Sequence, residues 1–374
     1  MSIWAWIGAG VGAIALWRLF RPQPRIQKKP PTKPLDRFDV AFLAERLSLS
    51  VDALESFEPK YTQRLIDKRG PYRSGNPGKR KLNVPEPDTM ELQRRILARI
   101  LRPLKVHPAA SGFEKGHSVV HNALPHAYQA VVLKMDIVSF FDTTRAERVL
   151  AYFQRIGWTK RAAQILTKLV THEGGLPQGA PTSPALSNRL NVALDTAIAR
   201  HARYYCGTYT RYADDITISF PKDYPSAVRS LAQRVRRVAK RYGYQVHKRR
   251  KLHVLRRHHS QRVTGLVVNE GPRLPRKTRR WLRAVEHRLK TQGEASLTEQ
   301  QLAGWRAYEK HVDTVRTEAL DREVTAIREE LAKEHGDIWS VAHRLSIPHS
   351  VAKVRIQRLG LWDPDWKSKK KKKR

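Results

Sequence analysis

Two adjacent aspartates, Asp214 and Asp215, lie in the stretch "RYADDITIS" at residues 211–219. Neighbouring carboxylates repel each other and are depleted from strand interiors, so a cation must compensate the pair if it lies at the tip of a β-hairpin. A third carboxylate, Asp136, ends the apolar run "VVLKMD". A strand end and a hairpin tip can bring three anions close enough to hold two Mg²⁺ ions about 3.5–4 Å apart. The spacing therefore predicts metal-assisted phosphoryl transfer.

The elements that must position these aspartates form an α+β pattern. The stretches "AVVLKMDIVSFF" and "TYTRYADDITISF" are typical of strands, and the second is typical of a hairpin. The stretch "GNPGKRKLNVP" predicts a turn and a short basic strand, and "RVTGLVVN" predicts another short strand. Helical periodicity is found in "TMELQRRILARIL" and in the ranges 36–70, 145–170, 183–202, 225–242 and 276–333.

The composition indicates a globular protein with a large excess of positive charge. Of 374 residues, 40% are hydrophobic, 72 are Lys or Arg and 34 are Asp or Glu, which gives a formal net charge of +38. A field of this strength binds polyanions, and nucleic acid is the commonest large one. The single cysteine, Cys206, excludes an intramolecular disulfide and a cysteine-based zinc cluster, and the 15 histidines show no zinc spacing.

Residues 1–20 are predicted to form a membrane anchor. The stretch 3–20, "IWAWIGAGVGAIALWRLF", carries no charge before Arg18 and has nearly the shortest length that spans a bilayer. Basic residues follow it, so the positive-inside rule keeps the rest of the chain in the cytoplasm. One alternative is a hydrophobic helix that docks on a partner; a cleaved signal peptide is disfavoured because the basic residues follow the apolar run. Residues 21–35, basic and proline-rich, form an extended linker.

The C-terminal region, residues 334–374, has a pattern of its own. Two short amphipathic helices around "SIP" in the range 336–362 indicate a helix-turn-helix-like unit, and "KSKKKKKR" indicates a disordered basic tail. The unit is expected either to grip a stem-loop of RNA or to read DNA as an effector.

Four stretches, in family order, resemble the motifs of reverse transcriptases. "GKRKLNVPEPDTMELQRRIL", at 78–97, matches the segment that contacts the incoming triphosphate, and "LKMDIVSFFD" matches the strand that supplies the first catalytic aspartate. "GGLPQGAPTSPALSNRL", at 174–190, matches the loop and helix that line the nucleotide pocket, and "RYADD" matches the Y-x-D-D hairpin. The chain is therefore similar to RNA-directed DNA polymerases.

Two further stretches resemble the retron type of reverse transcriptase in particular. "HNALPHA" has Asn122 and His126 in an N-A-x-x-H pattern, and "RVTGLVVN" has Val263, Thr264 and Gly265 in a V-T-G pattern. These residues are expected to contact structured RNA, although Asn122 and His126 have the equal alternative of stabilising an insert between fingers and palm.

The resemblance covers roughly residues 36–330 and implies a right-hand polymerase fold. Residues 36–270 are expected to form the fingers and palm, and residues 271–333 a helical thumb. The thumb tract "RLPRKTRRWLRAVEHRLK" combines cations with an aromatic residue, so Arg279, Arg280 and Trp281 are expected to contact nucleic acid.

By the same resemblance, Asp136, Asp214 and Asp215 hold two Mg²⁺ ions. The backbone carbonyl of Ile137 is expected as an additional ligand because it directly follows Asp136. The lysine that the family places after the hairpin falls within "HKRRKLH", where Arg250 takes the aligned position and a lysine is adjacent. That role is left unassigned.

The nucleotide pocket is expected to select deoxynucleotides. Phe141, five residues after Asp136, lies where similar polymerases place an aromatic ring against the sugar C2′, and a bulky ring there excludes a 2′-hydroxyl. Phe140 is expected in the core, because successive strand residues face opposite sides.

Basic and loop residues complete this pocket. Arg80, with Lys79 and Lys81 beside it, is expected to clamp the β- and γ-phosphates, since a guanidinium binds phosphate through two hydrogen bonds. Gln178 and Gly179 follow a proline and are expected to touch the sugar and phosphate of the nucleotide, with a purely structural turn as the alternative.

The resemblance implies synthesis of DNA from a structured non-coding RNA, primed by a 2′-hydroxyl, giving a branched RNA–DNA hybrid used in defence against phage. An effector protein and the bacterial inner membrane are expected partners. The alternatives are a bacterial reverse transcriptase of the intron or abortive-infection type, and a non-catalytic RNA-binding scaffold. Intron enzymes usually add maturase and endonuclease regions, and the three intact aspartates argue against a scaffold.

Overall fold

The computed structural model describes residues 38–67, 79–247, 251–334 and 337–345, together with 352–353, 356–357 and 359–361. A four-stranded antiparallel sheet in the order β4-β5-β3-β6 lies at its centre. Its strands are β3 (Val131–Asp136), β4 (Thr208–Tyr212), β5 (Asp215–Phe220) and β6 (His253–Arg256). The strand and hairpin predicted from the sequence are confirmed, except that the first strand ends at Asp136 instead of running to Phe141.

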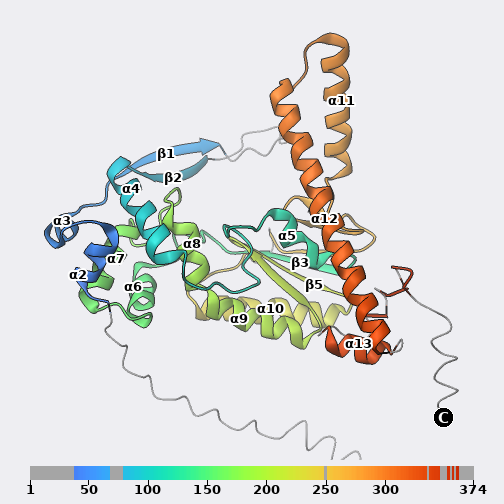
Figure 1. Cartoon of the computed structure of the whole chain (residues 1–374), viewed down its shortest axis with the longest axis horizontal. Helices are drawn as coiled ribbons and strands as arrows, with labels where there is room; N and C mark the ends of the chain where they lie inside the picture. The colour runs from blue at the N-terminus through green and yellow to red at the C-terminus, as the bar shows by residue number, and fades with distance from the viewer. Residues whose placement is uncertain are drawn as a thin grey trace, which may run out of the picture.

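The two faces of this sheet have different surroundings. Alternate strand residues such as Val131, Leu133 and Ile216 pack into one apolar cluster with α9 (Val192–Tyr204) and α10 (Pro225–Arg241), which cover this face (Figure 1). The residues between them point to the opposite side, because side chains alternate along a strand. The carboxylate of Asp136 therefore lies on the face away from α9 and α10.

A second apolar core lies beside the sheet and is made by short helices. They are α2 (Val40–Leu47), α3 (Val51–Ser56), α4 (Pro87–Ile96) with its π-helical continuation η2 (Leu97–Leu101), α6 (Ala146–Arg155), α7 (Lys160–Val170) and α8 (Thr182–Leu190). The sequence predicted one helix over 145–170 and one over 183–202. The chain instead breaks near Gly157, with a φ of 106°, and at Asn191, because each pair of helices must turn to bury both apolar faces.

A two-stranded ribbon extends from this helical part. Strand β1 (Tyr61–Asp67) pairs with β2 (Lys79–Pro85) along its whole length. The helical prediction for 36–70 is therefore wrong for residues 61–67, where pairing with a distant strand overrides a local apolar pattern.

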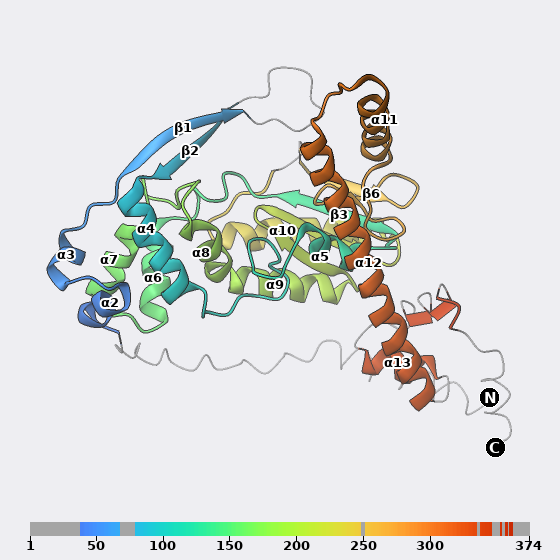
Figure 2. The same cartoon turned by 45° about the horizontal axis from the view of Figure 1, so that its top comes forward.

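A long helical hairpin stands on the same side of the sheet as the ribbon, at the other end (Figures 1 and 2). It consists of α11 (Arg276–Gln292) and α12 (Glu299–Lys333), so the predicted basic helical tract is confirmed but is divided in two. Gly293, in the left-handed region at φ 73°, ends the first helix. The hairpin packs on α5 (Val119–Ala123), on the short helix η3 (Leu124–His126) and on a tight turn between β7 (Arg262–Val263) and β8 (Leu266–Val267). The stretch "RVTGLVVN" is thus a small hairpin and not one strand.

The far end of α12 carries α13 (Ile338–Arg344). Short helical pieces at 352–353 and 356–357 follow, and the helix-turn-helix-like unit stays a prediction. Across the described ranges, no helix is both long and apolar enough to cross a bilayer. The predicted anchor at 3–20, the linker at 21–35 and the basic tail lie outside the described residues.

Candidate active site

The three predicted catalytic aspartates meet where β3 ends and the β4–β5 hairpin turns. Asp136 is the register partner of Asp215, and Asp214 lies in the two-residue turn between Tyr212 and Asp215. The amide of Ile137 donates to the carbonyl of Asp214 at 3.0 Å, which ties the turn to the end of β3. The structure therefore brings together the three side chains that the sequence predicted.

The environment of Asp214 and Asp215 disfavours the negative charge of these two carboxylates. Asp136 is only 7% exposed. Burial, followed by the charges of Asp136 and Asp215, raises the pKa of Asp214 from 3.8 to about 6. Burial also raises the pKa of Asp215, although Lys134 opposes that shift. Burial is therefore the main reason that both carboxylates hold a proton more tightly than a free aspartate does.

One lysine partly balances the site. The Nζ of Lys251 lies 2.8 Å from both carboxylate oxygens of Asp136, and His247 Nε2 lies 3.3 Å from one of them. The sequence placed a lysine next to the aligned position without giving it a partner. Arg250, the residue at that position, lies outside the described residues.

The donor set fits a hard divalent cation, because carboxylate and carbonyl oxygens are the ligands that Mg²⁺ prefers. Within the described ranges, no group of three or more His, Cys, Asp or Glu side chains is already arranged to hold a metal ion. The ammonium of Lys251 lies within hydrogen-bonding distance of both carboxylate oxygens of Asp136. Metal binding at this site therefore requires the lysine to move or share its partner.

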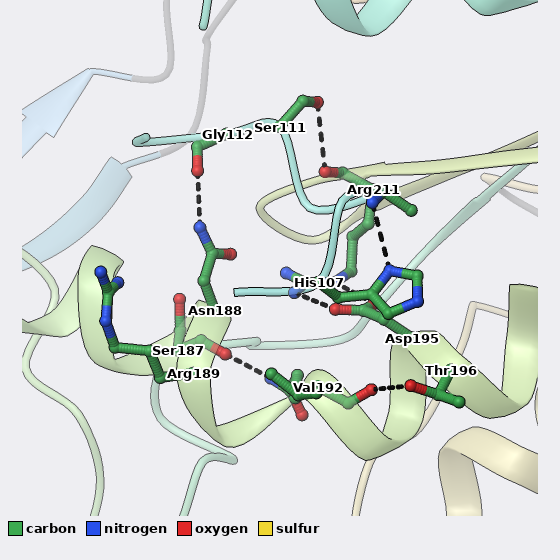
Figure 3. Close-up of polar contacts among 12 residues, drawn as sticks. His107, Ser111, Gly112, Ser187, Asn188, Arg189, Val192, Asp195, Thr196 and Arg211 are labelled. Carbon is green, nitrogen blue, oxygen red and sulfur yellow. Dashed lines mark hydrogen bonds and ion pairs between the residues drawn. The ribbon is translucent and has the colours of Figure 1, made fainter. Parts of the chain in front are cut away.

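A buried ion pair that the sequence reasoning missed supports the hairpin (Figure 3). Arg211, in β4, and Asp195, in α9, are both 0% exposed and are joined by two hydrogen bonds of 2.7 and 2.8 Å. Arg211 also donates to the carbonyl of Ala213 at 3.0 Å. Ala213 has a φ of 55°, which is uncommon for a residue with a side chain. The ion pair thus stabilises an unfavourable backbone conformation next to Asp214.

The nucleotide-pocket residues lie on the ribbon and on the loop before α8. The amide of Asn83, in β2, donates to the carbonyl of Gln178 at 2.8 Å. Gly179 has a φ of 117°, and a Cβ there would lie 3.2 Å from the carbonyl oxygen of Asn83, so a larger residue would be strained. The loop that carries Gln178 and Gly179 therefore packs closely against β2, which is the structural role offered as the alternative to nucleotide contact.

The basic residues of β2 are exposed. Lys81 pairs with Glu173 at 3.1 Å. Phe140 is buried at 4% exposed, as predicted, whereas Phe141 is half-buried. Its ring lies 6.3 Å, between centroids, from the exposed ring of Phe113, a neighbour that the sequence did not indicate.

The N-A-x-x-H residues are inside the protein. Asn122 and His126 are 0% exposed. The two ring nitrogens of His126 lie 2.8 Å from the hydroxyls of Ser219 and Thr210, on the same side of the sheet as Asp136. Burial lowers the pKa of His126 to about 3, so the ring is neutral. Of the two sequence alternatives, the structural one agrees with this geometry.

The V-T-G residues form the turn of the β7–β8 hairpin. Val263 is buried, and the hydroxyl of Thr264 donates to the carbonyl of Val119, at the start of α5, at 2.9 Å. Gly265 is exposed at a φ of 87°. The V-T-G turn therefore contacts α5, the helix that carries Asn122.

The thumb residues differ among themselves. Arg280 is exposed and Arg279 is half-buried. Trp281 packs edge to face on Trp305 of α12, with 5.9 Å between ring centroids, so its main contact is inside the helical hairpin. Contact of these side chains with nucleic acid stays a prediction.

Comparison with known proteins agrees with these motifs. The family model "Reverse transcriptase (RNA-dependent DNA polymerase)" matches residues 66–268. The retron Mx65 reverse transcriptase of Myxococcus xanthus is 38% identical over 274 residues, which cover 67% of this chain and 62% of that protein. The retron Mx162 enzyme of the same organism is 33% identical over 343 residues, covering 81% of this chain and 70% of the relative.

A third relative comes from another organism. The retron Ec86 reverse transcriptase of Escherichia coli is 34% identical over 178 residues, or 47% of this chain and 54% of the relative. The chain thus spans between 54% and 70% of the length of these three relatives. The match includes the strand, the hairpin and the nucleotide loop described above, and implies a right-hand polymerase fold. The chain therefore belongs to the reverse transcriptase family and, within it, to the retron type.

Proposed function

We propose that this protein is an RNA-directed DNA polymerase that copies part of a structured non-coding RNA into DNA. The observation that carries the proposal is the meeting of Asp136, Asp214 and Asp215 at one edge of a sheet, with raised pKa values for the last two. Such a site favours a bound cation, and two divalent ions are the usual requirement for in-line displacement at phosphorus.

The aspartates are proposed to hold two Mg²⁺ ions, with the carbonyl of Ile137 as a further ligand. When bound, the ions lower the pKa of the attacking hydroxyl and offset the charge of the leaving pyrophosphate. The protein contributes the fixed turn at Asp214, which the buried Arg211 supports through Ala213. Lys251 would exchange its contact with Asp136 for the phosphates of the substrate.

The incoming dNTP is proposed to lie between the ribbon and the catalytic edge. Lys79 and Arg80 are exposed on β2 and would bind the triphosphate, while Gln178 and Gly179 line the approach to the sugar. Phe141 would exclude the 2′-hydroxyl of ribonucleotides. In the terms of a right hand, the ribbon and short helices are fingers, the four-stranded sheet is the palm, and the α11–α12 hairpin is the thumb.

Priming from an internal 2′-hydroxyl, the branched product and a role in phage defence rest on the retron resemblance. The proposed function also includes a membrane tether at residues 3–20 and an effector protein as partner. The C-terminal region is proposed to bind the RNA.

Co-purification from a bacterium that carries the gene with its flanking DNA tests the proposal. The wild-type protein should carry RNA joined to DNA through a linkage that a debranching enzyme cleaves, and the Asp214→Ala and Asp215→Ala variants should carry RNA alone. Bound RNA without DNA in the wild type would refute the proposed synthesis and leave an RNA-binding scaffold. DNA without a branch would refute the 2′-hydroxyl priming only.

A further inference from the structure

An exposed phenylalanine occupies a strained position beside the catalytic hairpin. Phe113 is 46% exposed, and its backbone φ is 66°, in the left-handed region. That conformation is a clear outlier for a bulky side chain, and glycine would adopt it without cost. Strain of this kind persists where the surrounding structure fixes it, and it clusters at functional sites.

The surroundings of Phe113 do fix it. The preceding residue, Gly112, has its carbonyl held by Asn188 of α8 at 2.7 Å (Figure 3), and a Cβ on Gly112 would lie 3.0 Å from the amide nitrogen of Ala213. Before it, the amide of Ser111 donates to the carbonyl of Arg211 at 3.0 Å. The segment is therefore attached to the hairpin that carries the catalytic aspartates.

The buried N-A-x-x-H asparagine belongs to the same arrangement. The hydroxyl of Ser111 donates to Oδ1 of Asn122 at 2.6 Å, and both side chains are buried. This contact links α5 to the segment that ends at Phe113. It gives Asn122 a positioning role that requires no contact with nucleic acid.

The ring of Phe113 lies close to two residues of the candidate active site. Its centroid is 6.0 Å from that of Tyr212, which precedes the turn with Asp214, and 6.3 Å from that of Phe141, the proposed sugar gate. Nearly half of the Phe113 side chain is exposed and open to a ligand. A base pair held over Asp214, with its sugar at Phe141, would place nucleobases beside this ring.

We propose that Phe113, attached to the catalytic hairpin through Gly112 and Ser111, forms a base-contact site that packs against the template nucleobase at the insertion position. The ligand is a nucleobase of any sequence, because every base offers an apolar π-face. The proposal rests on the proposed polymerase function, and it assigns to Phe113 the orientation of the base that the incoming dNTP must pair with. The strained backbone is explained by the need to hold this ring outward.

Substitution of Phe113 separates this role from a structural one. Phe113→Gly and Phe113→Ala both remove the ring, but only glycine relieves the backbone strain. Phe113→Gly should melt at or above the wild type, by up to about 4 °C, and above Phe113→Ala. Both variants should raise the apparent Kd for dNTP in single-turnover incorporation by about 5- to 100-fold, since base–aromatic stacking has that value.

Two sets of matched variants complete the design. Phe113→Tyr and Phe113→Trp should restore dNTP affinity to within about 2-fold, because each keeps an aromatic face. Tyr204→Ala and Tyr224→Ala remove exposed aromatic rings, 78% and 56% exposed, from the helical side of the sheet, and should leave dNTP affinity unchanged. Wild-type dNTP affinity in Phe113→Gly would overturn the proposal, and so would a Phe113→Gly protein that unfolds at lower temperature than Phe113→Ala.

A binding measurement keeps this test independent of catalysis. An RNA–DNA duplex with 2-aminopurine at the templating position is titrated with protein in the absence of dNTP. Stacking on Phe113 should quench its fluorescence with the wild type and with Phe113→Tyr, and markedly less with Phe113→Gly. Equal quenching by the wild type and Phe113→Gly would refute the base contact. Absence of dNTP incorporation by the wild type, with a difference in quenching, would refute the polymerase function and leave the base-contact site intact.

Discussion

A buried aspartate, Asp195, and the half-buried pair Asp214 and Asp215 lie near the same hairpin and differ in how their charge is balanced. Asp195 is fully buried and is neutralised inside the protein by Arg211, with Tyr209 as a further donor at 2.6 Å. Asp214 and Asp215 lie a few residues along the chain from that arginine, yet their pKa values are raised. A charge that the protein balances itself contributes to the fold, whereas a charge left unbalanced is available for an external cation.

The largest expected effect is on activity, at the unbalanced set. Asp214→Asn should reduce RNA-templated dNTP incorporation by at least about 100-fold, because metal assistance contributes several kcal/mol to such reactions. The same variant should be at least as stable as the wild type in metal-free buffer, since it removes a repelled charge. Asp223→Asn, which affects a surface aspartate paired with Arg256, is the control and should retain activity. An Asp214→Asn protein that is less stable than the wild type but still active would show that Asp214 has a structural role and not a catalytic one.

The balanced set should show the opposite behaviour. Asp195→Asn leaves Arg211 buried without its partner and should lower the free energy of unfolding by about 3–5 kcal/mol, as measured by urea denaturation. The double variant Asp195→Leu with Arg211→Met should recover much of that loss, because it removes both charges. If Asp195→Asn unfolds at the wild-type urea concentration, the ion pair does not stabilise this part of the fold.

The pH dependence of stability gives a third test. The pKa of Asp214 is about 6 in the folded protein against an ordinary 3.8, so the folded state binds its proton more tightly than the unfolded state. In chelator, the free energy of unfolding should fall as pH rises from about 4 to about 6, by on the order of 3 kcal/mol from this residue. Asp215 acts in the same direction. Asp214→Asn should flatten the curve, and added Mg²⁺ should reduce the loss above pH 6.

A smaller effect is expected at the buried histidine. His126→Ala leaves the hydroxyls of Ser219 and Thr210 without their partner and should cost about 1–3 kcal/mol of stability. Its affinity for RNA should keep the wild-type salt dependence. Arg280→Ala, at an exposed thumb position, should instead weaken RNA binding and lower the salt slope by about 1 without affecting stability. If RNA binding by the folded His126→Ala protein depended less on salt concentration than that of the wild type, His126 would contact RNA.

The contrast also separates what the sequence could predict from what it could not. Asp136, Asp214 and Asp215 were found because a strand end and a hairpin are local patterns that bring them together. The pairing of Asp195 with Arg211 was not, because it joins a helix to a strand and depends on the packing of α9 against the sheet. Asp195 lies in a helix, and nothing in the neighbouring sequence indicates that its partner is Arg211.

Other differences have the same origin. His126 carried a recognisable pattern, but a pattern does not reveal whether a side chain faces solvent or the core. Phe113 carried no pattern at all; its importance follows from a backbone angle and two ring neighbours. The strand at residues 61–67 was expected to be helical because its partner lies beyond the reach of a local apolar pattern.

Metal-dependent catalysis at Asp214 can be measured as incorporation of dNTP by the purified protein on a primed RNA template while Mg²⁺ is varied. The wild type, Asp214→Asn and Asp195→Asn are compared at a temperature where all three are folded. We expect Mg²⁺-dependent DNA synthesis by the wild type, none by Asp214→Asn, and retained synthesis with lower thermal stability for Asp195→Asn. Equal synthesis by the wild type and Asp214→Asn, or synthesis that does not depend on a divalent ion, would contradict it.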